Sequence, residues 1–393
     1  MNIGIITINS DNFGCSLQTY AVIKAFEKLG HKALLIPDTT DSGVRSRYGK
    51  ESTLSKLRPA YILAVLKVRT KNKYLLKNQR DSLIEAVLHK NKNAALFAQA
   101  KKQRRASFAD FNKEYLPATD FSINAGNISD DLSDKFDFFS VGSDQVWNPT
   151  YPHTSEIRFL TFAKNNQKLS FAPSFGISEL PGNVKEPYAK WLGDFPVLSV
   201  REERGAEIIK ELTGKEAAVI CDPTLTLLRN EWEQIEKRPE CFPDAPYALT
   251  YFLGNETNAS RRYIEKIAKE KNLKVINLFD IRESEYYAVN PSEFIYLIHH
   301  ADAVFTDSFH ATVFSIIFKK DFVVFDRIED GKSMGSRLKT LLEKFSLSDR
   351  MFSSVSKQEF RSIDFTHTDK IIEKERTKAL DFLQKNIKIN LNN

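Results

Sequence analysis

Short apolar runs that alternate with helical patterns are the feature that most constrains the fold of this chain. In its first part the runs are four to six residues long and lack polar alternation, which is typical of parallel strands covered on both faces. They lie at residues 3–8, 33–36, 136–141, 168–172, 197–200 and 217–221. Between the first two, apolar residues recur near helical spacing from Leu17 to Leu29, and Gly30 follows as a C-cap. This order predicts βαβ units with right-handed crossovers.

A second series of the same kind begins at Tyr247. Two such series predict an α/β protein with two Rossmann-like domains, residues 1–225 and residues 226–393. The boundary is expected near residues 222–244, where prolines accumulate, and the long charged helix at 368–386 is expected to cross back to the first domain. In the second series the strands are expected at 247–252, 275–279, 303–305 and 322–325, and the helices at 260–271, 292–301, 309–318 and 336–345.

A strongly basic helical block, residues 45–116, interrupts the first domain. It holds 18 Lys and Arg against five Asp and Glu, a local net charge of +13 in a chain whose total is +6. Such a block suggests contact with an anionic surface, and its apolar run at 61–66, flanked by cations, has the residue mix of an interfacial helix. Two hypotheses follow: a solvated helical insertion that packs on its own domain, or contact with a membrane surface. No nucleic-acid-binding module accompanies the charge, so no nucleic acid partner is expected.

Cysteine count and the N-terminus indicate the compartment. Cys15, Cys221 and Cys241 are odd in number and far apart, which excludes a disulfide framework and a cysteine-cluster zinc site. The first residues lack the basic region of a signal peptide, and no stretch approaches 18 consecutive apolar residues. We therefore expect a cytoplasmic protein. No metal-ligand spacing or cofactor fingerprint is present, so neither a metal nor a cofactor is predicted.

Ligands of open α/β sheets bind beyond the carboxyl ends of the strands, and the loop at 9–16 follows the first strand. Asn12, Gly14 and Ser16 stand where a close backbone approach and free helix amides attract an anion. The alternative is a capped helix start, with Ser16 or Asn12 as N-cap. Cys15 is interpreted as a small buried thiol rather than a nucleophile.

Three further strand ends carry polar residues. The loop at 141–149 places Asp144, Gln145 and Trp147 together, a set that suits a sugar; alternatively, Asp144 caps a turn and Trp147 fills a core. Arg201 stands at a strand end, where it can grip a carboxylate or phosphate with two hydrogen bonds, or else pair with a glutamate on the surface. The turn at 222–224 is interpreted as mostly architectural.

The strongest local signal is a histidine at a strand-to-helix junction. Ser308 and His310 follow the strand at 303–305, so His310 is able to protonate a reacting group while nearby helix amides hold an anion. The alternative is a structural histidine. Lys332 and Arg337 lie in a following loop and helix start, as expected for a second anion grip or for a solvated loop.

Taken in order, these segments resemble the polysaccharide pyruvyl transferase family. Cys15 and Ser16 replace the small residues usual after the glycine, and Ala311 stands where glycine often follows the histidine. Neither change removes a side chain that the chemistry needs. The resemblance covers roughly residues 1–349 apart from the basic block, and the matching segments are 12–14, 17–21, 141–148, 170–176, 199–202, 222–225, 306–311 and 336–338.

The resemblance implies a two-domain, GT-B-like arrangement with the active cleft between the domains. It implies that phosphoenolpyruvate and a sugar diol give a cyclic pyruvate ketal and phosphate during capsule or exopolysaccharide biosynthesis. His310 would then be the general acid, and Asp144 a base or a hydroxyl-positioning group. Gln145 and Trp147 would contact the acceptor. Phosphoenolpyruvate would contact Asn12, Gly14, Ser16, Arg201, Ser308, Lys332 and Arg337.

The expected acceptor is a glycan linked to undecaprenyl diphosphate, which would bring the protein to the inner face of the plasma membrane. Two alternatives remain at this stage. One is a GT-B glycosyltransferase that uses a nucleotide-sugar donor, and the other is a catalytically silent glycan-binding member of the family.

Overall fold

The computed structural model describes residues 1–40, 94–151, 154–254, 256–329, 332–333, 336–356 and 359–391. Most of the basic block, including its apolar run at 61–66, lies outside the described residues, as does the side chain of Lys332.

The first lobe is built on parallel strands whose side chains are largely buried on both faces. Four strands form one sheet in the order β2 (Lys32–Leu35), β1 (Asn2–Ile6), β3 (Phe138–Val141) and β4 (Lys168–Ser170). A second parallel pair consists of β5 (Leu198–Val200) and β6 (Ala217–Val219). These strands are therefore apolar throughout because both of their faces are buried, as expected for a parallel sheet.

Serine side chains join β4 to β5 where no backbone ladder does. The Ser199 backbone N–H donates to Ser170 Oγ at 2.7 Å, and Ser199 Oγ donates to the Ser170 carbonyl at 2.6 Å. The Ala172 N–H in turn donates to Ser199 Oγ at 3.1 Å. The two pieces thus lie edge to edge, and the chain leaves β3, β4 and β5 at one common edge.

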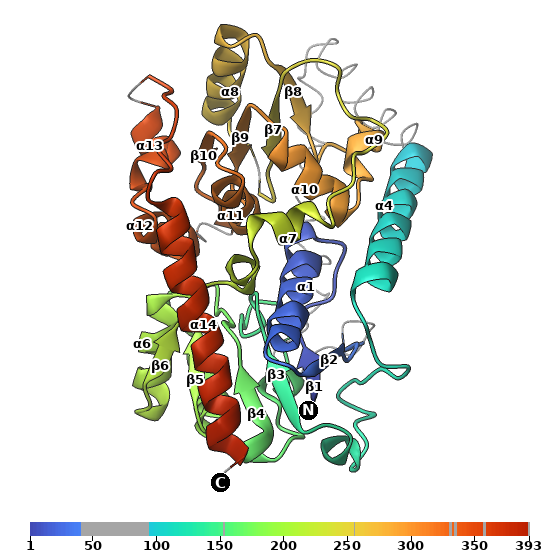
Figure 1. The fold of residues 1–393 in the computed structure, drawn as a ribbon, viewed down its shortest axis with the longest axis vertical. Helices are drawn as coiled ribbons and strands as arrows, with labels where there is room; N and C mark the ends of the chain where they lie inside the picture. Colours follow the sequence, from blue (N-terminus) through green and yellow to red (C-terminus); the bar gives the residue numbers. More distant parts are fainter. Residues whose placement is uncertain are drawn as a thin grey trace, which may run out of the picture.

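The second lobe repeats this architecture (Figure 1). Its parallel strands follow the order β10 (Phe322–Val324), β9 (Ala303–Thr306), β7 (Tyr247–Tyr251) and β8 (Lys274–Asn277). The helices between them are α8 (Asn258–Glu270), α10 (Pro291–His299) and α11 (Phe309–Ile317). Two Rossmann-like lobes face one another, so the predicted α/β, GT-B-like fold class is confirmed.

Helix α1 (Phe13–Lys28) packs between the lobes, which explains why nearly all of it is buried. Its first residue, Phe13, stacks on Phe294 of α10 with ring centroids 4.2 Å apart. Two helices of the first lobe, α5 (Gly182–Gly193) and α6 (Glu203–Thr213), were not anticipated from the sequence. Gly182 and Pro187 in α5 and Gly205 in α6 are residues that normally argue against a helix.

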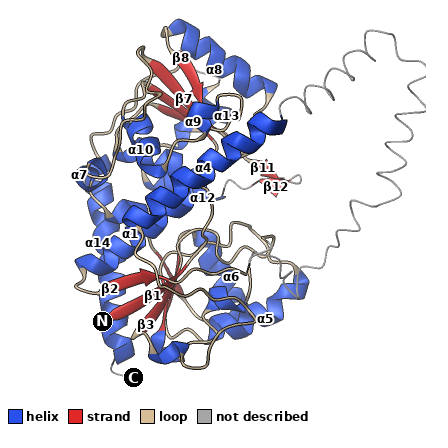
Figure 2. Cartoon of the chain, turned by 90° about the vertical axis from the view of Figure 1, so that its right-hand side faces the viewer, coloured by secondary structure: helices blue, strands red, loops and turns tan. Residues whose placement is uncertain are grey.

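Two long helices run along both lobes (Figures 1 and 2). Helix α14 (Thr368–Leu391) leaves the second lobe and continues beside the first, where the Cys221 thiol donates to the Glu375 carbonyl at 3.4 Å. Helix α4 (Ala94–Tyr115) is the part of the basic block that the structure describes, and its Ser107 hydroxyl donates to the Ala288 carbonyl of the second lobe at 2.6 Å.

The remaining elements are short. They are the helices α7 (Arg229–Glu233), α9 (Ser284–Tyr287), α12 (Ser336–Lys344) and α13 (Phe352–Val355), the hairpin β11 (Ile328–Glu329) and β12 (Lys332–Ser333), and the 3₁₀ turns Leu132–Asp134, Glu156–Phe159, Asn165–Gln167, Pro223–Thr226 and Ser348–Arg350. Within the described residues, none of the helices combines the length and the apolar character that a membrane span requires.

Candidate active site

A cavity of about 360 Å³ lies where the carboxyl ends of the strands of both lobes meet. The first lobe contributes polar side chains from the loops after β1 and β3, and the second lobe contributes residues that follow β7, β8, β9 and β10. From the first lobe the lining includes Ser10, Asn12, Cys15, Asp144, Gln145 and Tyr151. From the second it includes Leu253, Phe279, Asp307, Ser308, Phe309, His310, Arg327 and Arg337.

His310 lies in the first turn of α11 and is 5% exposed. The hydroxyl of Ser308 caps this helix by accepting from the Ala311 N–H at 3.4 Å. Ser308 and His310, both predicted from the sequence, line the cavity. The ring abuts Gly14, where a Cβ would lie 2.1 Å from His310 Nδ1. The backbone of Gly14 is not left-handed, so this position is glycine because the imidazole leaves no room for a side chain.

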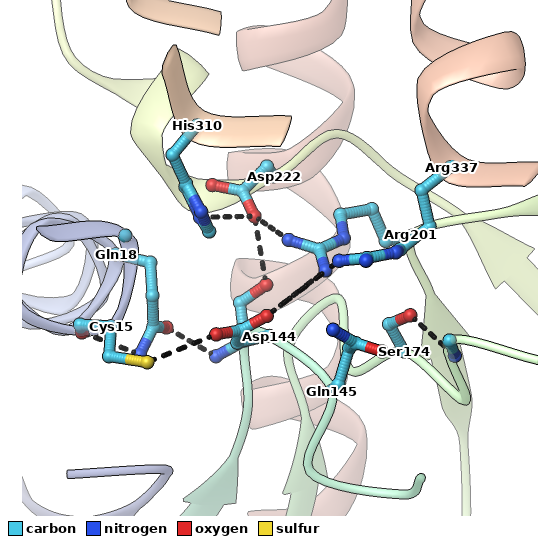
Figure 3. Close-up of polar contacts among 12 residues, drawn as sticks. Cys15, Gln18, Asp144, Gln145, Ser174, Arg201, Asp222, His310 and Arg337 are labelled. Carbon is cyan, nitrogen blue, oxygen red and sulfur yellow. Dashed lines mark hydrogen bonds and ion pairs between the residues drawn. The ribbon is translucent and has the colours of Figure 1, made fainter. Parts of the chain in front are cut away.

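Asp222 lies beside His310 (Figure 3). Its Oδ2 accepts from Ser143 Oγ at 3.1 Å, pairs with Arg201 Nη1 at 2.5 Å, and lies 3.7 Å from His310 Nε2. Burial would raise the pKa of this carboxyl, but Arg201 and His310 hold it well below its usual range. The interpretation of the turn at 222–224 as mostly architectural therefore missed a charged partner of the histidine.

Arg201 is buried and does not line the cavity. Besides its pair with Asp222, its Nη2 lies 3.4 Å from Asp144 Oδ1, and its guanidinium stacks 4.3 Å from the Phe309 ring centroid. Burial would lower its pKa, but the two carboxylates outweigh burial and raise it. In this structure the guanidinium is engaged by two carboxylates and does not reach the cavity, so the direct grip of Arg201 on phosphoenolpyruvate stays a prediction.

Asp144 lines the cavity and is 8% exposed. Its Oδ2 accepts from the Cys15 thiol at 3.3 Å, while its Oδ1 faces Arg201 and lies 3.9 Å from Arg337 Nη1. Burial would raise its pKa, but His310, Arg201 and Arg337 together lower it, so Asp144 is anionic. Burial and the neighbouring Asp144 charge raise the pKa of Cys15, which is the buried, protonated thiol that the sequence predicts.

Arg337 stands in the first turn of α12 with its side chain 8% exposed. It lines the cavity, and among the described residues we find no hydrogen bond that it donates; its closest charged contact is the 3.9 Å pair with Asp144. Burial and the nearby Arg201 lower its pKa. Most of the five donors of this guanidinium are therefore available to an anionic ligand.

The site residues predicted in and after the loop before α1 differ in whether they line the cavity. Asn12 lines the cavity and also caps α1, because its Oδ1 accepts from the Gly14 N–H at 2.9 Å. Ser16 is buried, donates to Asn112 Oδ1 at 3.2 Å and does not line the cavity. Gly14 is covered by His310 and Ser16 faces α4, so neither lines the cavity, and their contact with a ligand stays a prediction.

The two residues predicted to contact the acceptor, Gln145 and Trp147, also differ in whether they line the cavity. Gln145 lines the cavity, but its amide is held by Tyr151 and Asn148, at 3.0 Å each. Trp147 is fully buried: its indole N–H donates to the Arg158 carbonyl at 2.9 Å and its ring stacks on Phe159. The prediction that Trp147 contacts the acceptor is wrong, because the ring fills the core of the first lobe.

Several cavity residues are not among the predicted site residues, and Tyr151, Phe279, Asp307 and Arg327 are the ones whose side chains suit a ligand. Phe279, Asp307 and Arg327 each follow the end of a strand, β8, β9 and β10, so the rule that selects strand ends would have found them. Asp307 accepts from the N–H groups of Leu253 and Gly254 at 2.7 and 2.8 Å, and burial raises its pKa. Phe279 is 44% exposed.

Among the described residues, Glu236, His299 and His300 form a group able to hold a metal ion, but it does not line the cavity. Arg229 Nη2 lies 2.8 Å from His299 Nε2, and an arginine only donates. The other nitrogen, Nδ1, must then carry the proton and donate to Glu236 at 2.9 Å. A histidine satisfied on both sides presents no lone pair to a metal at Nδ1.

Comparison with protein-family models identifies a family for this chain. A family model described as polysaccharide pyruvyl transferase matches residues 12–328. No curated protein sequence matches the chain.

Solved structures with the same general build share little sequence with this chain. The UDP-GlcNAc 2-epimerase of Neisseria meningitidis, bound to UDP-GlcNAc, has 10% identity and a TM-score of 0.41, over 99% of this chain and 94% of that one. A putative UDP-N-acetylglucosamine 2-epimerase of Listeria monocytogenes has 10% identity and a TM-score of 0.47, over 99% and 90%. The glycosyltransferase SnogD of Streptomyces nogalater has 10% identity and a TM-score of 0.39, over 99% of each chain. Likenesses this distant carry no inference about ligand or activity.

Proposed function

Because the chain belongs to the polysaccharide pyruvyl transferase family, we propose that it transfers pyruvate from phosphoenolpyruvate to two hydroxyls of a sugar and releases phosphate. The observation that carries this proposal is the pairing, in one cavity, of a nearly buried histidine with an arginine whose donors are available. A donor that carries a carboxylate and a phosphate and must be protonated on carbon needs these two groups side by side.

The anionic groups of phosphoenolpyruvate have two suitable partners among the described residues. Arg337 offers a planar fork of N–H donors, which matches a carboxylate or a phosphate. The first turn of α11, a helix of nine residues, presents backbone N–H groups beside Ser308. We assign the donor substrate to the space between Arg337 and the start of α11, which brings its reactive carbon next to His310.

The proposed chemistry uses one proton donor. His310 protonates C3 of the enol, a new C–H bond forms, and C2 becomes an oxocarbenium ion that a first sugar hydroxyl attacks. The C2–O bond to phosphate then breaks, and the second hydroxyl attacks C2 to close the ketal. Of the two hydroxyl protons released, one restores His310 and the other leaves on the phosphate, which departs as hydrogen phosphate. The anionic Asp144 accepts a hydrogen bond from the attacking hydroxyl and orients it.

The acceptor sugar requires an apolar surface as well as polar partners. Phe279 supplies one, because it lines the cavity while 44% of its surface remains exposed. Phe279 is also held edge-on by Tyr251 and tilted against Tyr287, with ring centroids 6.0 and 6.2 Å away, so its position is fixed. We propose that Phe279, rather than Trp147, contacts the acceptor sugar. The basic block further supports an acceptor carried on a lipid diphosphate.

The test is incubation with phosphoenolpyruvate and a panel of lipid-linked and simple glycosides, followed by phosphate release and mass spectrometry of the glycan. We expect phosphate and a ketal-linked pyruvate in equal amounts. A parallel incubation with nucleotide sugars examines the glycosyltransferase alternative. Glycan binding without phosphate release in either incubation would identify a catalytically silent member, and sugar transfer from a nucleotide would replace the proposal.

A further inference from the structure

The most deeply buried acid of the site is Asp222, which is 1% exposed and does not line the cavity. Its Oδ1 accepts from the backbone N–H of Thr224 at 3.0 Å and from the hydroxyl of Thr224 at 2.7 Å. These two bonds fix the plane of the carboxylate. Its other oxygen, Oδ2, is therefore aimed in one direction, toward Ser143, Arg201 and His310.

His310 is confined against this oxygen from the opposite side. Its Nε2 lies 3.7 Å from Asp222 Oδ2, is buried, and has no hydrogen-bond partner among the described residues. On one side the ring rests on Gly14, where an added carbon would lie 2.1 Å from Nδ1. Nδ1 is nevertheless not enclosed as Nε2 is, and His310 lines the cavity. The imidazole thus occupies a slot between the first turn of α1 and Asp222, and the slot determines which way the ring faces.

We propose that Asp222 is the positioning residue of His310: its Oδ2 accepts the Nε2–H hydrogen bond in the substrate complex, which leaves Nδ1 to deliver the proton. The inference rests on the proposed function, in which His310 protonates carbon. A separation of 3.7 Å is longer than a hydrogen bond, and such contacts commonly tighten only in the substrate complex. Here the contact joins the two lobes, since Asp222 follows β6 and His310 begins α11.

A carboxylate serves this purpose better than a neutral acceptor. An imidazole is an acid at one nitrogen only while the other nitrogen keeps its own proton, and an anion beside Nε2 favours that protonated form. The other charged groups of this cluster (Figure 3) are Asp144 after β3, Arg201 after β5 and Arg337 on α12. The charged contacts of the two arginines are with Asp144 and Asp222.

The test is the variant Asp222→Asn, which keeps the shape and still accepts from Thr224 but turns an N–H toward His310. We expect kcat to fall by about 10²–10⁴-fold with little change in the KM for phosphoenolpyruvate, because Asp222 does not touch the donor. An unchanged kcat, or a loss confined to the KM for phosphoenolpyruvate, would overturn the proposal.

The matched control is Ser143→Ala, which removes a hydrogen bond to the same Oδ2 but keeps the charge. We expect it to retain most of kcat. If its kcat falls as far as that of Asp222→Asn, Asp222 acts only through local packing and the proposal fails.

A measurement on the wild-type protein covers the case in which Asp222→Asn does not fold. Long-range ¹H–¹⁵N spectra of protein labelled with ¹⁵N-histidine report the protonation of each ring, and the His310 signals are assigned by their loss in His310→Gln. We expect a protonated, hydrogen-bonded Nε2 in the presence of phosphoenolpyruvate, and an unprotonated Nε2 would overturn the proposal. This result does not depend on transfer: a protein that forms no ketal refutes the proposed function, while the spectrum still decides the role of Asp222.

Discussion

Arg201 and Arg337 both face Asp144, but only Arg337 lines the cavity. We expect Arg337→Ala to raise the KM for phosphoenolpyruvate by roughly ten- to a hundredfold, because it removes charge-assisted hydrogen bonds worth about 1.5–3 kcal/mol. Its thermal midpoint should change little. Steady-state kinetics and a calorimetric unfolding curve check both expectations, and a rise confined to the acceptor KM would contradict the assignment of Arg337 to the donor.

Arg201→Ala, by contrast, should lower the stability of the protein. Its removal leaves Asp222 and Asp144 buried without their shared cation, and breaking a buried ion pair costs roughly 3–5 kcal/mol of the free energy of unfolding. The expected result is a clearly lower thermal midpoint, measured by circular dichroism. A stable Arg201→Ala protein with a selectively weakened donor affinity would instead return Arg201 to the role that the sequence first suggested.

Phe279 gives a prediction for the acceptor. Phe279→Ala should raise the acceptor KM about tenfold, because it removes an apolar face worth about 1.5 kcal/mol or more, and should leave the donor KM unchanged. Phe279→Tyr keeps the ring and should stay close to wild type. Equal acceptor kinetics for all three proteins would remove the sugar from this part of the cavity.

Sequence alone identifies the residue types at a strand end but not the direction in which each side chain points. Asp144, His310, Ser308 and Arg337 do line one cavity, as their positions after strands or at helix starts predict. Trp147 lies in the same loop as Asp144, yet its ring turns into the core, where Phe159 stacks on it. Loop residues two or three apart face different ways, and only packing decides which of them meets the ligand.

At the scale of elements, the contact between α1 and α11 makes a sharp prediction. Gly14→Ala should stabilise α1 as an isolated helix, since alanine exceeds glycine by about 1 kcal/mol in helix propensity. The added carbon would nevertheless meet His310 Nδ1 and push the imidazole out of place. We expect kcat to fall nearly as far as in His310→Gln while the protein remains folded, as judged by circular dichroism.

Gly182→Ala provides the matched control, because Gly182 also stands in the first turn of a helix, α5, and an added Cβ there meets nothing within 4 Å. It should keep full activity. If Gly14→Ala is as active as Gly182→Ala, His310 does not need its present position.

The elements that the sequence predicts well are the buried strands, which stand out as apolar runs. Every predicted strand is present within a few residues, because a parallel strand covered on both faces is apolar throughout. Helices α5 and α6 were missed because glycine or proline interrupts them, and packing against the sheet overrides that local preference. The serine link between β4 and β5 has no signature in a single sequence, since only the fold brings Ser170 and Ser199 together.

The whole molecule is two lobes tied together by segments distant in sequence. Buried Arg104 of α4 donates to the carbonyls of Asp11 in the first lobe and Tyr287 in the second, at 3.0 and 2.7 Å. Asp11 precedes Asn12 in the cavity wall, so this helix also supports the site. The sequence predicts two domains and a crossing final helix, but the role of α4 depends on contacts between chain segments more than 180 residues apart.

The basic block, whose last part is α4, gives the last prediction. A family member that acts on a lipid-linked glycan has to reach the membrane, and cations near an anionic leaflet contribute about 1 kcal/mol each. We expect the protein to sediment with acidic liposomes at low salt and to be released at high salt, where attraction is screened over a few ångströms. Charge reversal at Lys67, Arg69, Lys71 and Lys73 should abolish sedimentation yet preserve activity on a soluble acceptor.

The control for that experiment reverses as many exposed lysines outside the basic block, at Lys185, Lys190, Lys266 and Lys339. Both variants lower the net charge of the chain by the same amount, so a difference between them reports where the charge lies rather than how much there is. Because residues 45–116 carry a net +13 while the rest of the chain is net negative, attraction to the leaflet must be local if it exists. Equal binding to neutral and acidic vesicles, or equal loss in both variants, would leave the block as a solvated insertion that packs on its own domain.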